Sequence, residues 1–573
     1  MPEKDVVIRL AGTAGEGALS MGELMGRAFA RLGWELLLYF SFEAEVRGEK
    51  PSFSQLRVSD VKPLSQGGSI DVLVALNKDA LEMNLPELSP DGAVIYDGSP
   101  IDAFRGEIKY EPVLPPGVRG TAVPFEVISS NIGFPSAKNM AALGAAAHIL
   151  GIPLDMLSSL VESRFKKKGE TVTGHNLNAL RMGHDHLAGV EAVHGFEKRG
   201  VPKLMVSGNQ ASALGAVAGG CRFFAGYPIT PATEVMEALA RDLPASGGTV
   251  MQAEDEMAAL GMVIGASFAG TRAMTATSGP GLSLMSELVG LSSTAEVPAV
   301  ILDVQRGGPG TGLPTRPEQS DLYMALHCGH GEPPRIVLAP ACVEECYIAL
   351  ARAHTLAERY QMPVIVLTDQ YIGYRRETLD ALPPVDAGDA RVKPTPEELE
   401  KYMRYKDTES GISPMSIPGE PSGMFVATGL EHTEAGLPAY DAVTHKAMMD
   451  KRARKLATAS VEKWSHRFGA GDADVGVIAW GGVAGAAREA VEAAVREGIK
   501  AAGYYTVFIS PLPEDEMREF IKPVKKIIVP ELNHDGQFAR LLRERFLVEP
   551  VSVAQPLGGP FPVSAILDAI RGV

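Results

Sequence analysis

Four short runs of glycine, proline and polar residues limit the fold of this chain more than any other feature, because each follows an apolar stretch of strand-like length. The runs are 226–231, 254–256, 277–281 and 303–308. In open α/β sheets the loops at the carboxyl ends of parallel strands meet at one edge, and ligands bind there. The sequence therefore predicts an α/β domain in which these four runs border one pocket.

The side chains in these runs have a chemistry that suits a binding pocket. Pro228 and Pro231 fix the backbone around Thr230 and hold its hydroxyl in a defined place. Glu256 begins a segment of small residues that favours close helix packing, and a carboxyl group in that position suits proton exchange. Arg306 follows an apolar run, and a guanidinium at a strand end can bind a small carboxylate with two hydrogen bonds.

Each of these features, taken alone, has a simpler structural explanation. A proline-rich run is often only a turn, and acidic residues at a helix start pair favourably with the helix dipole. An arginine at a strand end is often part of a surface ion pair. The order and spacing of the four runs therefore carry the functional interpretation, not any single residue.

In order and spacing, the runs resemble the pyrimidine-binding domain of thiamine-diphosphate-dependent 2-oxoacid:ferredoxin oxidoreductases. In that family a Tyr-Pro-Ile-Thr-Pro turn opens the domain, a glutamate precedes a small-residue helix and an arginine ends a later strand. The resemblance implies catalytic roles for Thr230, Glu256 and Arg306. It implies that the cofactor is bound by Tyr227, Pro228, Ile229 and Glu256.

The resemblance also implies a reaction. Residues 311–319 are similar to the version found in α subunits specific for 2-oxoglutarate. The implied reaction is oxidative decarboxylation of 2-oxoglutarate to succinyl-CoA and carbon dioxide with reduction of ferredoxin, and it is reversible. Glu256 would exchange a proton with the pyrimidine ring of the cofactor, while Arg306 and Thr230 would hold the carboxylate that leaves as carbon dioxide.

The first region, 1–190, begins with a strand at 6–10, a glycine-rich turn at 12–17 and a helix at 18–32. Bare amides of such a turn and the start of the helix form a cradle for anions. No acidic residue is placed to bind a ribose hydroxyl, which argues against a dinucleotide site. Further strands fit 71–76 and 92–97, so an α/β layout is predicted.

This region resembles the γ domain of the same oxidoreductases, which is associated with coenzyme A. The glycine turn, the run 45–48 and the run 138–140 carry the likeness. The resemblance makes the following residues candidates for coenzyme A: Gly12, Thr13, Gly15, Gly17, Arg47 and Asn139. A purely structural role for the glycine turn and the arginine is the alternative.

A chain of 573 residues is too long for one core and implies three or four domains. After the first region we expect a linker at 191–203 and a pyrimidine-binding α/β domain at 204–378. A segment rich in proline and glycine, 379–471, is expected to wrap across domains or a partner subunit. The strand and helix pattern of 472–573 resembles the transketolase C-terminal-like domain of the family.

Composition argues against several classes of function. A net charge of −16 disfavours nucleic acid or an anionic membrane as the partner. Four cysteines are too few for a disulfide scaffold and suit a reducing cytoplasm. No apolar run reaches about 18 residues and no export leader is recognisable, so membrane insertion and export are not expected. The cysteines lack the spacing of a metal or iron-sulfur site, so no metal site is predicted in this chain.

One motif is missing, and its absence predicts a partner. Enzymes that bind thiamine diphosphate hold its phosphates through a divalent metal at a Gly-Asp-Gly motif, and this chain contains none. It therefore resembles half an active site. The resemblance places Mg²⁺, the diphosphate site and a [4Fe-4S] cluster in a separate β subunit, in an (αβ)₂ assembly. The open alternatives are the same chemistry on pyruvate or another 2-oxoacid, and a non-catalytic coenzyme A-binding regulatory subunit.

Overall fold

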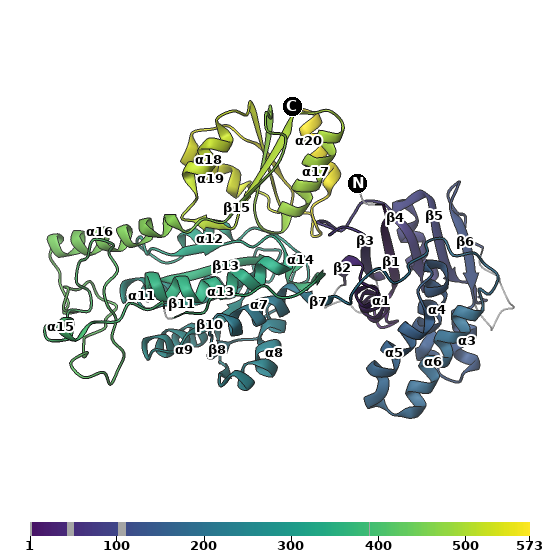
Figure 1. Ribbon diagram of the computed structural model, residues 1–573, viewed down its shortest axis with the longest axis horizontal. Helices are drawn as coiled ribbons and strands as arrows, with labels where there is room; N and C mark the ends of the chain where they lie inside the picture. Colours follow the sequence, from purple (N-terminus) through teal and green to yellow (C-terminus); the bar gives the residue numbers. More distant parts are fainter. Residues whose placement is uncertain (1–2, 43–50, 101–110, 389) are drawn as a thin grey trace. The chain divides into compact units, whose positions relative to one another are not determined.

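The computed structural model describes residues 3–42, 51–100, 111–388 and 390–573, and the chain forms two compact units (Figure 1). The first unit combines Met1–Val206 with Arg375–Ala381, and the second combines Ser207–Tyr374 with Leu382–Val573. Each unit is built from sheets covered by helices. The predicted multidomain α/β architecture is confirmed.

The first unit contains an eight-stranded mixed sheet in the order β6-β5-β4-β1-β3-β2-β14-β7. Strands β1, β4, β5 and β6 run parallel, and β3 pairs antiparallel with both β1 and β2. The strands are β1 (Asp5–Thr13), β2 (Glu35–Ser41), β3 (Pro51–Ser59), β4 (Ile70–Ala75), β5 (Leu88–Asp97), β6 (Arg119–Val123), β7 (Leu204–Ser207) and β14 (Arg376–Leu379). Strand β14 comes from a distant part of the sequence and pairs with β2 through Arg376 opposite Leu38.

Six helices accompany this sheet: α1 (Ala18–Leu32), α2 (Lys78–Asn84), α3 (Phe125–Asn131), α4 (Lys138–Leu150), α5 (Leu154–Phe165) and α6 (Glu170–Asp185). Helices α4 and α6 pack very closely because glycines remove the side chain at the contact. A Cβ on Gly144 would lie 1.9 Å from the carbonyl oxygen of Leu180, and one on Gly183 would lie 1.9 Å from that of Ala141. No larger residue fits at either position without separating the helices.

The second unit is organised around a seven-stranded sheet in the order β18-β12-β13-β11-β10-β8-β9. All neighbours are parallel except β18, which pairs antiparallel with β12. The strands are β8 (Phe223–Gly226), β9 (Thr249–Gln252), β10 (Ala273–Thr277), β11 (Ala299–Gln305), β12 (Ile336–Leu338), β13 (Pro363–Asp369) and β18 (Phe508–Ser510). The accompanying helices are α7 (Gly208–Ala218), α8 (Thr233–Asp242), α9 (Glu256–Phe268), α10 (Gly279–Leu284), α11 (Ser286–Thr294), α12 (Leu322–His327), α13 (Val343–Tyr360) and α14 (Gln370–Tyr374).

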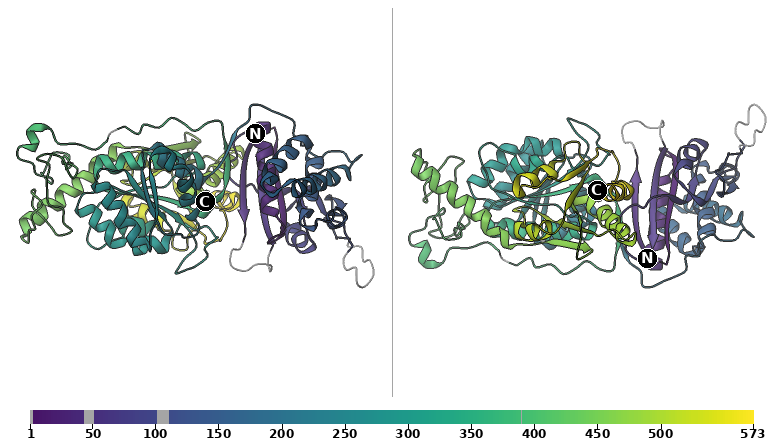
Figure 2. Two further views of the ribbon diagram at one scale, coloured as in Figure 1. Left: turned by 90° about the horizontal axis from the view of Figure 1, so that it is seen from below. Right: turned by 90° about the horizontal axis from the view of Figure 1, so that it is seen from above.

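Both faces of this sheet are covered, which explains why its central strands are apolar throughout (Figure 2). Alternate residues point to opposite cores: Ile301 and Ile365 pack with the residues of α9, whereas Leu302 and Val364 pack with those of α8 and α13. Every residue of β11 is therefore buried, including Asp303. An acidic residue in such a strand has no route to solvent.

The C-terminal part of the second unit adds a five-stranded sheet in the order β15-β17-β16-β19-β20. Its elements are β15 (Ser465–Gly469), β16 (Val475–Ala479), α17 (Ala484–Arg496), β17 (Ala501–Thr506), α18 (Glu514–Ile521), β19 (Lys526–Glu531), α19 (Gln537–Phe546), β20 (Val551–Ala554) and α20 (Val563–Arg571). Trp480 and Phe538 belong to the same core as Ile301, so the two sheets share apolar packing. Strand β17 ends at Thr506, and Phe508 of β18 then leaves this sheet and pairs with Leu338 of β12.

The long segment between β14 and β15 has little regular structure, but it is packed against the second unit. It contains the short helix α15 (Pro396–Leu399) and the long helix α16 (Ala442–Thr458). Tyr405 and Met415 are buried in it. The basic run within 446–455 forms part of α16, and two of its lysines, Lys451 and Lys455, are turned inward and fully buried.

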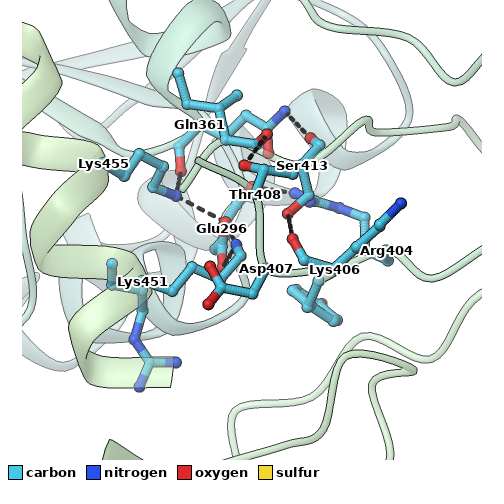
Figure 3. A network of polar contacts seen from close by, with 12 residues as sticks. Glu296, Gln361, Arg404, Lys406, Asp407, Thr408, Ser413, Lys451 and Lys455 are labelled. Atoms are coloured by element: carbon cyan, nitrogen blue, oxygen red, sulfur yellow. Dashed lines mark hydrogen bonds and ion pairs between the residues drawn. The ribbon is translucent and has the colours of Figure 1, made fainter. Parts of the chain in front are cut away.

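A buried charge network holds α16 in place (Figure 3). Lys451 Nζ donates to Glu296 Oε1 at 2.7 Å, and Lys455 Nζ donates to Glu296 Oε2 at 2.8 Å. Arg404 donates to the carbonyl oxygen of Glu296, and all four residues are excluded from solvent. Burial alone would raise the pKa of Glu296, but the charges of Lys455, Lys451 and Arg404 hold it far below its ordinary value. We call this set the Glu296 network.

Candidate active site

The topology of the seven-stranded sheet places the four predicted loops side by side. They follow β11, β10, β8 and β9, which are consecutive parallel neighbours in that order. The chain moves outward from β8 to β9 and then crosses back to β10, so the strand order reverses beside β8. Such a reversal opens a crevice at the carboxyl edge of a parallel sheet.

Glu256 is the first residue of α9, at this edge. The preceding Asp255 caps the helix, since its carboxylate accepts a hydrogen bond from the amide of Ala258 at 2.7 Å. Glu256 itself is buried, and its side chain lies over Gly281: a Cβ on that glycine would be 2.8 Å from Glu256 Oε1. The neighbouring Glu254 is exposed. The three acidic residues thus have different surroundings, and only Glu256 is buried.

Arg306 and Thr230 are brought together, although 76 residues separate them. Arg306 Nη1 donates to the backbone carbonyl oxygen of Thr230 at 2.7 Å, and Arg306 is buried. The contact uses the carbonyl of Thr230 and not the hydroxyl on which the sequence interpretation relied. Tyr227, in the same loop, is 41% exposed, so it borders the site without being enclosed by this chain.

Two further carboxylates lie at the same edge, and neither was predicted as a site residue. Asp303 is fully buried in β11, and both of its carboxylate oxygens lack a hydrogen-bond partner among the described residues. Asp321, immediately before α12, lies over Gly279: a Cβ on that glycine would be 2.6 Å from Asp321 Oδ2. Asp321 and Glu256 therefore approach the same turn, 277–281, at Gly279 and at Gly281. We call Asp303 and Asp321 the acid pair.

The acid pair is electrostatically perturbed. Burial, followed by the neighbouring Asp321 carboxylate, raises the pKa of Asp303 well above its ordinary value. Burial and the charge of Glu318 raise the pKa of Asp321 to about 7, against the opposing charge of Arg306. An ionisable residue inside a fully apolar strand was the sequence signal that could have revealed Asp303. Asp321 had no comparable local signal.

The C-terminal sheet fixes the loop that carries Asp321. Gln319 is fully buried, and its amide donates to the carbonyl oxygen of Leu532. The side chain of Gln319 donates to Trp480 O at 2.9 Å and accepts from the amide of Leu532 at 3.1 Å, while Asn533 Nδ2 donates to Gln319 O at 3.0 Å. Gln305 Oε1 accepts from the amide of Asp321 at 3.1 Å, which ties the loop to the end of β11.

This edge fits the ring end of thiamine diphosphate. Glycines at 279 and 281 leave the backbone open to a flat ring, and a buried carboxylate, Glu256, lies beside them. Within the described ranges that carboxylate forms no hydrogen bond, so it can take a ring nitrogen as its partner. In the same part of the chain, no group of three or more His, Cys, Asp or Glu residues is placed to hold a metal ion.

The predicted coenzyme A residues lie in the first unit, around the turn that joins β1 to α1. Gly15 and Gly17 have left-handed backbone angles, with φ of 99° and 92°. The side chain of Asn139 lies directly against Gly17, since a Cβ there would be 2.1 Å from Asn139 Nδ2. The structure therefore brings Asn139 to the glycine turn. Arg47 and the run 45–48 lie outside the described residues.

The turn also carries its own carboxylate. Glu16 accepts from the amide of Thr13 at 2.7 Å and from Asn77 Nδ2 at 2.5 Å. Asn77 Nδ2 donates to the hydroxyl of Thr13 at 2.8 Å. Lys138 Nζ lies 3.5 Å from Glu16 Oε1 and 3.0 Å from Asp97 Oδ2. One amide of the predicted anion cradle is thus already bonded, and Lys138 supplies the nearby positive charge.

A separate cavity of about 630 Å³ lies away from the four loops. Its walls come from the ends of α12, α16 and α19 and from the loop at 509–515, and they include His327, Arg335, Pro511 and Arg545. His327, at the end of α12, lines this cavity.

Among the helices that the structure describes, none combines the length and the apolar character needed to cross a membrane.

Family models match three parts of the chain. Residues 214–451 match the family described as pyruvate flavodoxin/ferredoxin oxidoreductase, thiamine diP-bdg. Residues 7–186 match pyruvate ferredoxin/flavodoxin oxidoreductase, and residues 473–565 match pyruvate:ferredoxin oxidoreductase core domain II. The three matches follow the order in which the sequence predicted related domains.

Individual proteins are similar over most or all of the chain. The 2-oxoglutarate oxidoreductase subunit KorA of Mycobacterium tuberculosis is 33% identical, over 99% of this chain and 91% of the relative. The 2-oxoglutarate synthase subunit KorA of Methanothermobacter marburgensis is 39% identical, over 65% of this chain and 99% of the relative. A solved 2-oxoglutarate:ferredoxin oxidoreductase from Magnetococcus marinus, with 2-oxoglutarate, coenzyme A and succinyl-CoA bound, is 38% identical with a TM-score of 0.93, covering 100% of this chain and 99% of that chain.

Proposed function

The chain belongs to the 2-oxoacid:ferredoxin oxidoreductases, and on that premise we propose that it is the α subunit, with a fused γ domain, of a 2-oxoglutarate:ferredoxin oxidoreductase. The enzyme oxidatively decarboxylates 2-oxoglutarate to succinyl-CoA and carbon dioxide and passes the electrons to ferredoxin. The observation that carries the choice of substrate is the whole-chain likeness to a protein solved with 2-oxoglutarate and succinyl-CoA bound. Reductive carboxylation is the same reaction in reverse.

The residues of this chain have distinct tasks in that reaction. Thiamine diphosphate, when bound, supplies the nucleophilic carbon and the electron sink that decarboxylation of a 2-oxoacid requires. Glu256, buried against Gly281, holds and returns a proton at the pyrimidine ring. Arg306 binds the carboxylate next to the keto carbon and aligns it for loss, and Thr230 orients Arg306 through its carbonyl oxygen.

The distribution of exposed apolar side chains supports a partner subunit at this edge. Large apolar residues are exposed on the loops and helices that surround Glu256: Tyr227, Met251, Met257, Met262, Leu284 and Leu313. Exposed apolar side chains near a polar site are typical of a surface that a protein covers. We infer that a β subunit covers it and carries the diphosphate site, Mg²⁺ and a [4Fe-4S] cluster, in an (αβ)₂ assembly in the cytoplasm.

Coenzyme A is assigned to the first unit. The glycine turn 12–17, with Asn139 against Gly17 and Lys138 nearby, supplies backbone amides and a positive charge for a phosphate or the pantetheine arm. Thr13 would contribute its hydroxyl. The acyl group formed at the second unit is then transferred to the thiol of coenzyme A.

Reconstitution with the β subunit tests the proposal. The complex should reduce ferredoxin or a viologen dye with 2-oxoglutarate and coenzyme A, faster than with pyruvate or an aryl pyruvate, whereas the isolated chain should not. Turnover by the isolated chain would contradict the half-site. Equal or greater activity with pyruvate would change the assigned substrate. Coenzyme A binding without turnover of any 2-oxoacid would indicate a regulatory subunit.

Changing Glu256→Gln should lower kcat by at least about 100-fold while the complex still assembles, because the proton-exchanging group is lost. Size-exclusion chromatography and steady-state kinetics measure the two effects. Glu237→Gln, on an exposed position of α8, is the matched control and should retain wild-type turnover. Near-normal turnover in the Glu256 variant would remove that residue from the mechanism.

A further inference from the structure

Part of the irregular segment between β14 and β15 exposes an unusual number of apolar side chains. It lies beside α9 and α11 in the second unit (Figure 1). Three side chains are almost entirely exposed: Met424 at 92%, Tyr440 at 88% and Val443 at 81%. Three more apolar residues in this part are exposed to a smaller extent: Val426, Leu430 and Leu437. We call residues 424–443 the arm.

Such a concentration of apolar side chains on a surface is typical of a binding site. Single exposed apolar residues are common on soluble proteins and need no explanation. Six of them within one short irregular segment, by contrast, form an apolar surface that water solvates poorly. The arm would therefore gain free energy if another protein covered it.

The backbone of the arm is fixed, although it contains little regular structure. The ring of His432 lies 4.0 Å from that of the fully buried Tyr405, whose amide donates to the carbonyl oxygen of Glu434 at 2.9 Å. Arg452 of α16 donates to both carboxylate oxygens of Glu431, at 3.0 and 2.7 Å. The apolar side chains are thus presented from an ordered backbone, which reduces the entropy lost when a partner binds.

The arm continues the exposed surface of the candidate active site. Met257, Gly261 and Gly265 are exposed and lie four residues apart, so they share one face of α9. A Cβ on either glycine would meet no atom within 4 Å, which leaves this face open. At the last residue of α9, the ring of Phe268 lies 5.5 Å from that of Phe425 in the arm. A partner that covers the start of α9 can therefore reach the arm along the same helix.

The charge of the arm and its flanks disfavours a second copy of the arm as the occupant. Residues 407–445 contain no Lys or Arg but six acidic residues: Asp407, Glu409, Glu420, Glu431, Glu434 and Asp441. Two such segments in contact would bring like charges together. A different polypeptide, with Lys or Arg residues around an apolar face, is the complementary partner.

We propose that the arm is a second docking surface for the β subunit, the same subunit that covers the candidate active site. The inference rests on the proposed function, because that function requires a β subunit at the start of α9. Glu256 and Phe268 are the first and last residues of α9, so the arm lies at the other end of the helix from the chemistry. It acts on assembly of the complex and not on turnover.

The affinity of the full chain for the β subunit tests the arm. Met424→Ser, Tyr440→Ser and Val443→Ser should each weaken binding by about 5- to 20-fold, and the triple variant by at least about 100-fold, because apolar area buried in the complex is lost. Isothermal titration calorimetry measures the affinity. The kcat at saturating β subunit should keep the wild-type value, while the concentration of β subunit that gives half-maximal activity should rise.

Leu547→Ser is the matched control. Leu547 follows α19 and is 91% exposed, which equals the exposure of Met424, but it lies outside the arm. This variant should bind the β subunit with wild-type affinity. Thermal unfolding of the isolated arm variants should also match the wild type, since the changed side chains are exposed in the isolated chain. Wild-type affinity in the triple variant, or an equal loss in Leu547→Ser, would overturn the proposal.

Hydrogen exchange of the wild-type chain identifies the occupant without a substitution. Amides of residues 424–443 should exchange more slowly when the β subunit is added. Protection that depends on the concentration of this chain alone, and that the β subunit does not increase, would assign the arm to a second copy and overturn the proposal.

The same measurements separate the arm from the proposed function. A complex that is weakened by the arm variants but acts on no 2-oxoacid would overturn the proposed function and leave the arm as a docking surface. A complex that turns over 2-oxoglutarate and binds the arm variants with wild-type affinity would overturn the arm and leave the proposed function standing.

Discussion

The second unit contains two groups of buried charge that differ in how they are compensated. In the Glu296 network, one carboxylate is bonded to Lys451 and Lys455, and its carbonyl accepts from Arg404. In the acid pair, both carboxylate oxygens of Asp303 and Oδ2 of Asp321 lack a hydrogen-bond partner in the described part of the chain. The first group joins α16 to the core, and the second lies at the edge where the cofactor is proposed to bind. The buried carboxylate that is paired with cations stabilises the fold, whereas the buried carboxyl groups without such partners lie at the candidate active site.

The contrast is visible in the pKa values. Cations hold the pKa of Glu296 far below its ordinary value despite burial, so it stays ionised. Burial lowers the pKa of Lys455 to about 7, although Glu296 opposes this, because three cations share one anion. At the acid pair, burial and like charge act in the same direction and favour the proton.

Glu296→Gln should have the largest effect on stability. It leaves Lys451, Lys455 and Arg404 buried without a counter-charge, and breaking a buried ion pair in this way costs about 3–5 kcal/mol. Denaturant unfolding of the purified chain measures the loss. The KM for 2-oxoglutarate of the protein that remains folded should not change. A loss below about 1 kcal/mol would show that the network contributes little and that the comparison is wrong.

Arg306→Lys should raise the KM for 2-oxoglutarate by about 10- to 100-fold, since an ammonium cannot form the two-pronged contact with a carboxylate. The same variant should change the unfolding free energy little, which is the opposite of the Glu296 result. Steady-state kinetics of the αβ complex measure the effect. An unchanged KM would transfer the carboxylate role to Arg316 or another residue.

Asp321→Asn should stabilise the protein at alkaline pH. The folded-state pKa of about 7 exceeds the ordinary value of 3.8, so the folded chain holds more protons than the unfolded chain between these values. The free energy of unfolding therefore falls as pH rises from about 4 through about 7, and the variant avoids this fall. We expect it to be about 1–2 kcal/mol more stable than the wild type at pH 8 and similar at pH 4, by thermal unfolding. Equal stability at both pH values would argue against a buried, ionising Asp321.

Lys446→Gln should have the smallest effect. Lys446 lies on the exposed side of α16 and pairs with Asp450 one turn away, whereas Lys451 and Lys455 of the same helix are buried. Exposed pairs of this kind contribute only a few tenths of a kcal/mol. The variant therefore tests whether burial, and not membership of α16, makes a charge important. A loss as large as that of Glu296→Gln would remove this distinction.

The sequence predicted the parts of the site that depend on local pattern. Four loops at strand ends become neighbours because the strands are parallel, and the resemblance of these loops to the oxidoreductase family is what singled out Glu256, Thr230 and Arg306. Their roles as site residues remain predictions. The glycine turn of the first unit was recognisable for the same reason, since a strand, glycines and a helix occur within a few residues.

The remaining parts depend on contacts between distant residues. Gln319 and Leu532 are more than 200 residues apart, and nothing near Asp321 indicates that the C-terminal sheet fixes its loop. Glu296 and Lys455 are 159 residues apart, so the run of basic residues in α16 gave no sign that two of its lysines point inward. Periodicity describes which face of an element is apolar, but it does not identify the buried charge that a distant residue will neutralise.

Strand β14 has a consequence for proteolysis. The chain leaves the first unit after Val206 and returns to it for Arg375–Ala381, where β14 pairs with β2, before it leaves again. The first unit is therefore built from two separate segments of the chain. A protease that cleaved the chain just after Val206 would not release the N-terminal fragment. Strand β14 belongs covalently to the C-terminal fragment, and it would stay paired with β2 of the N-terminal fragment.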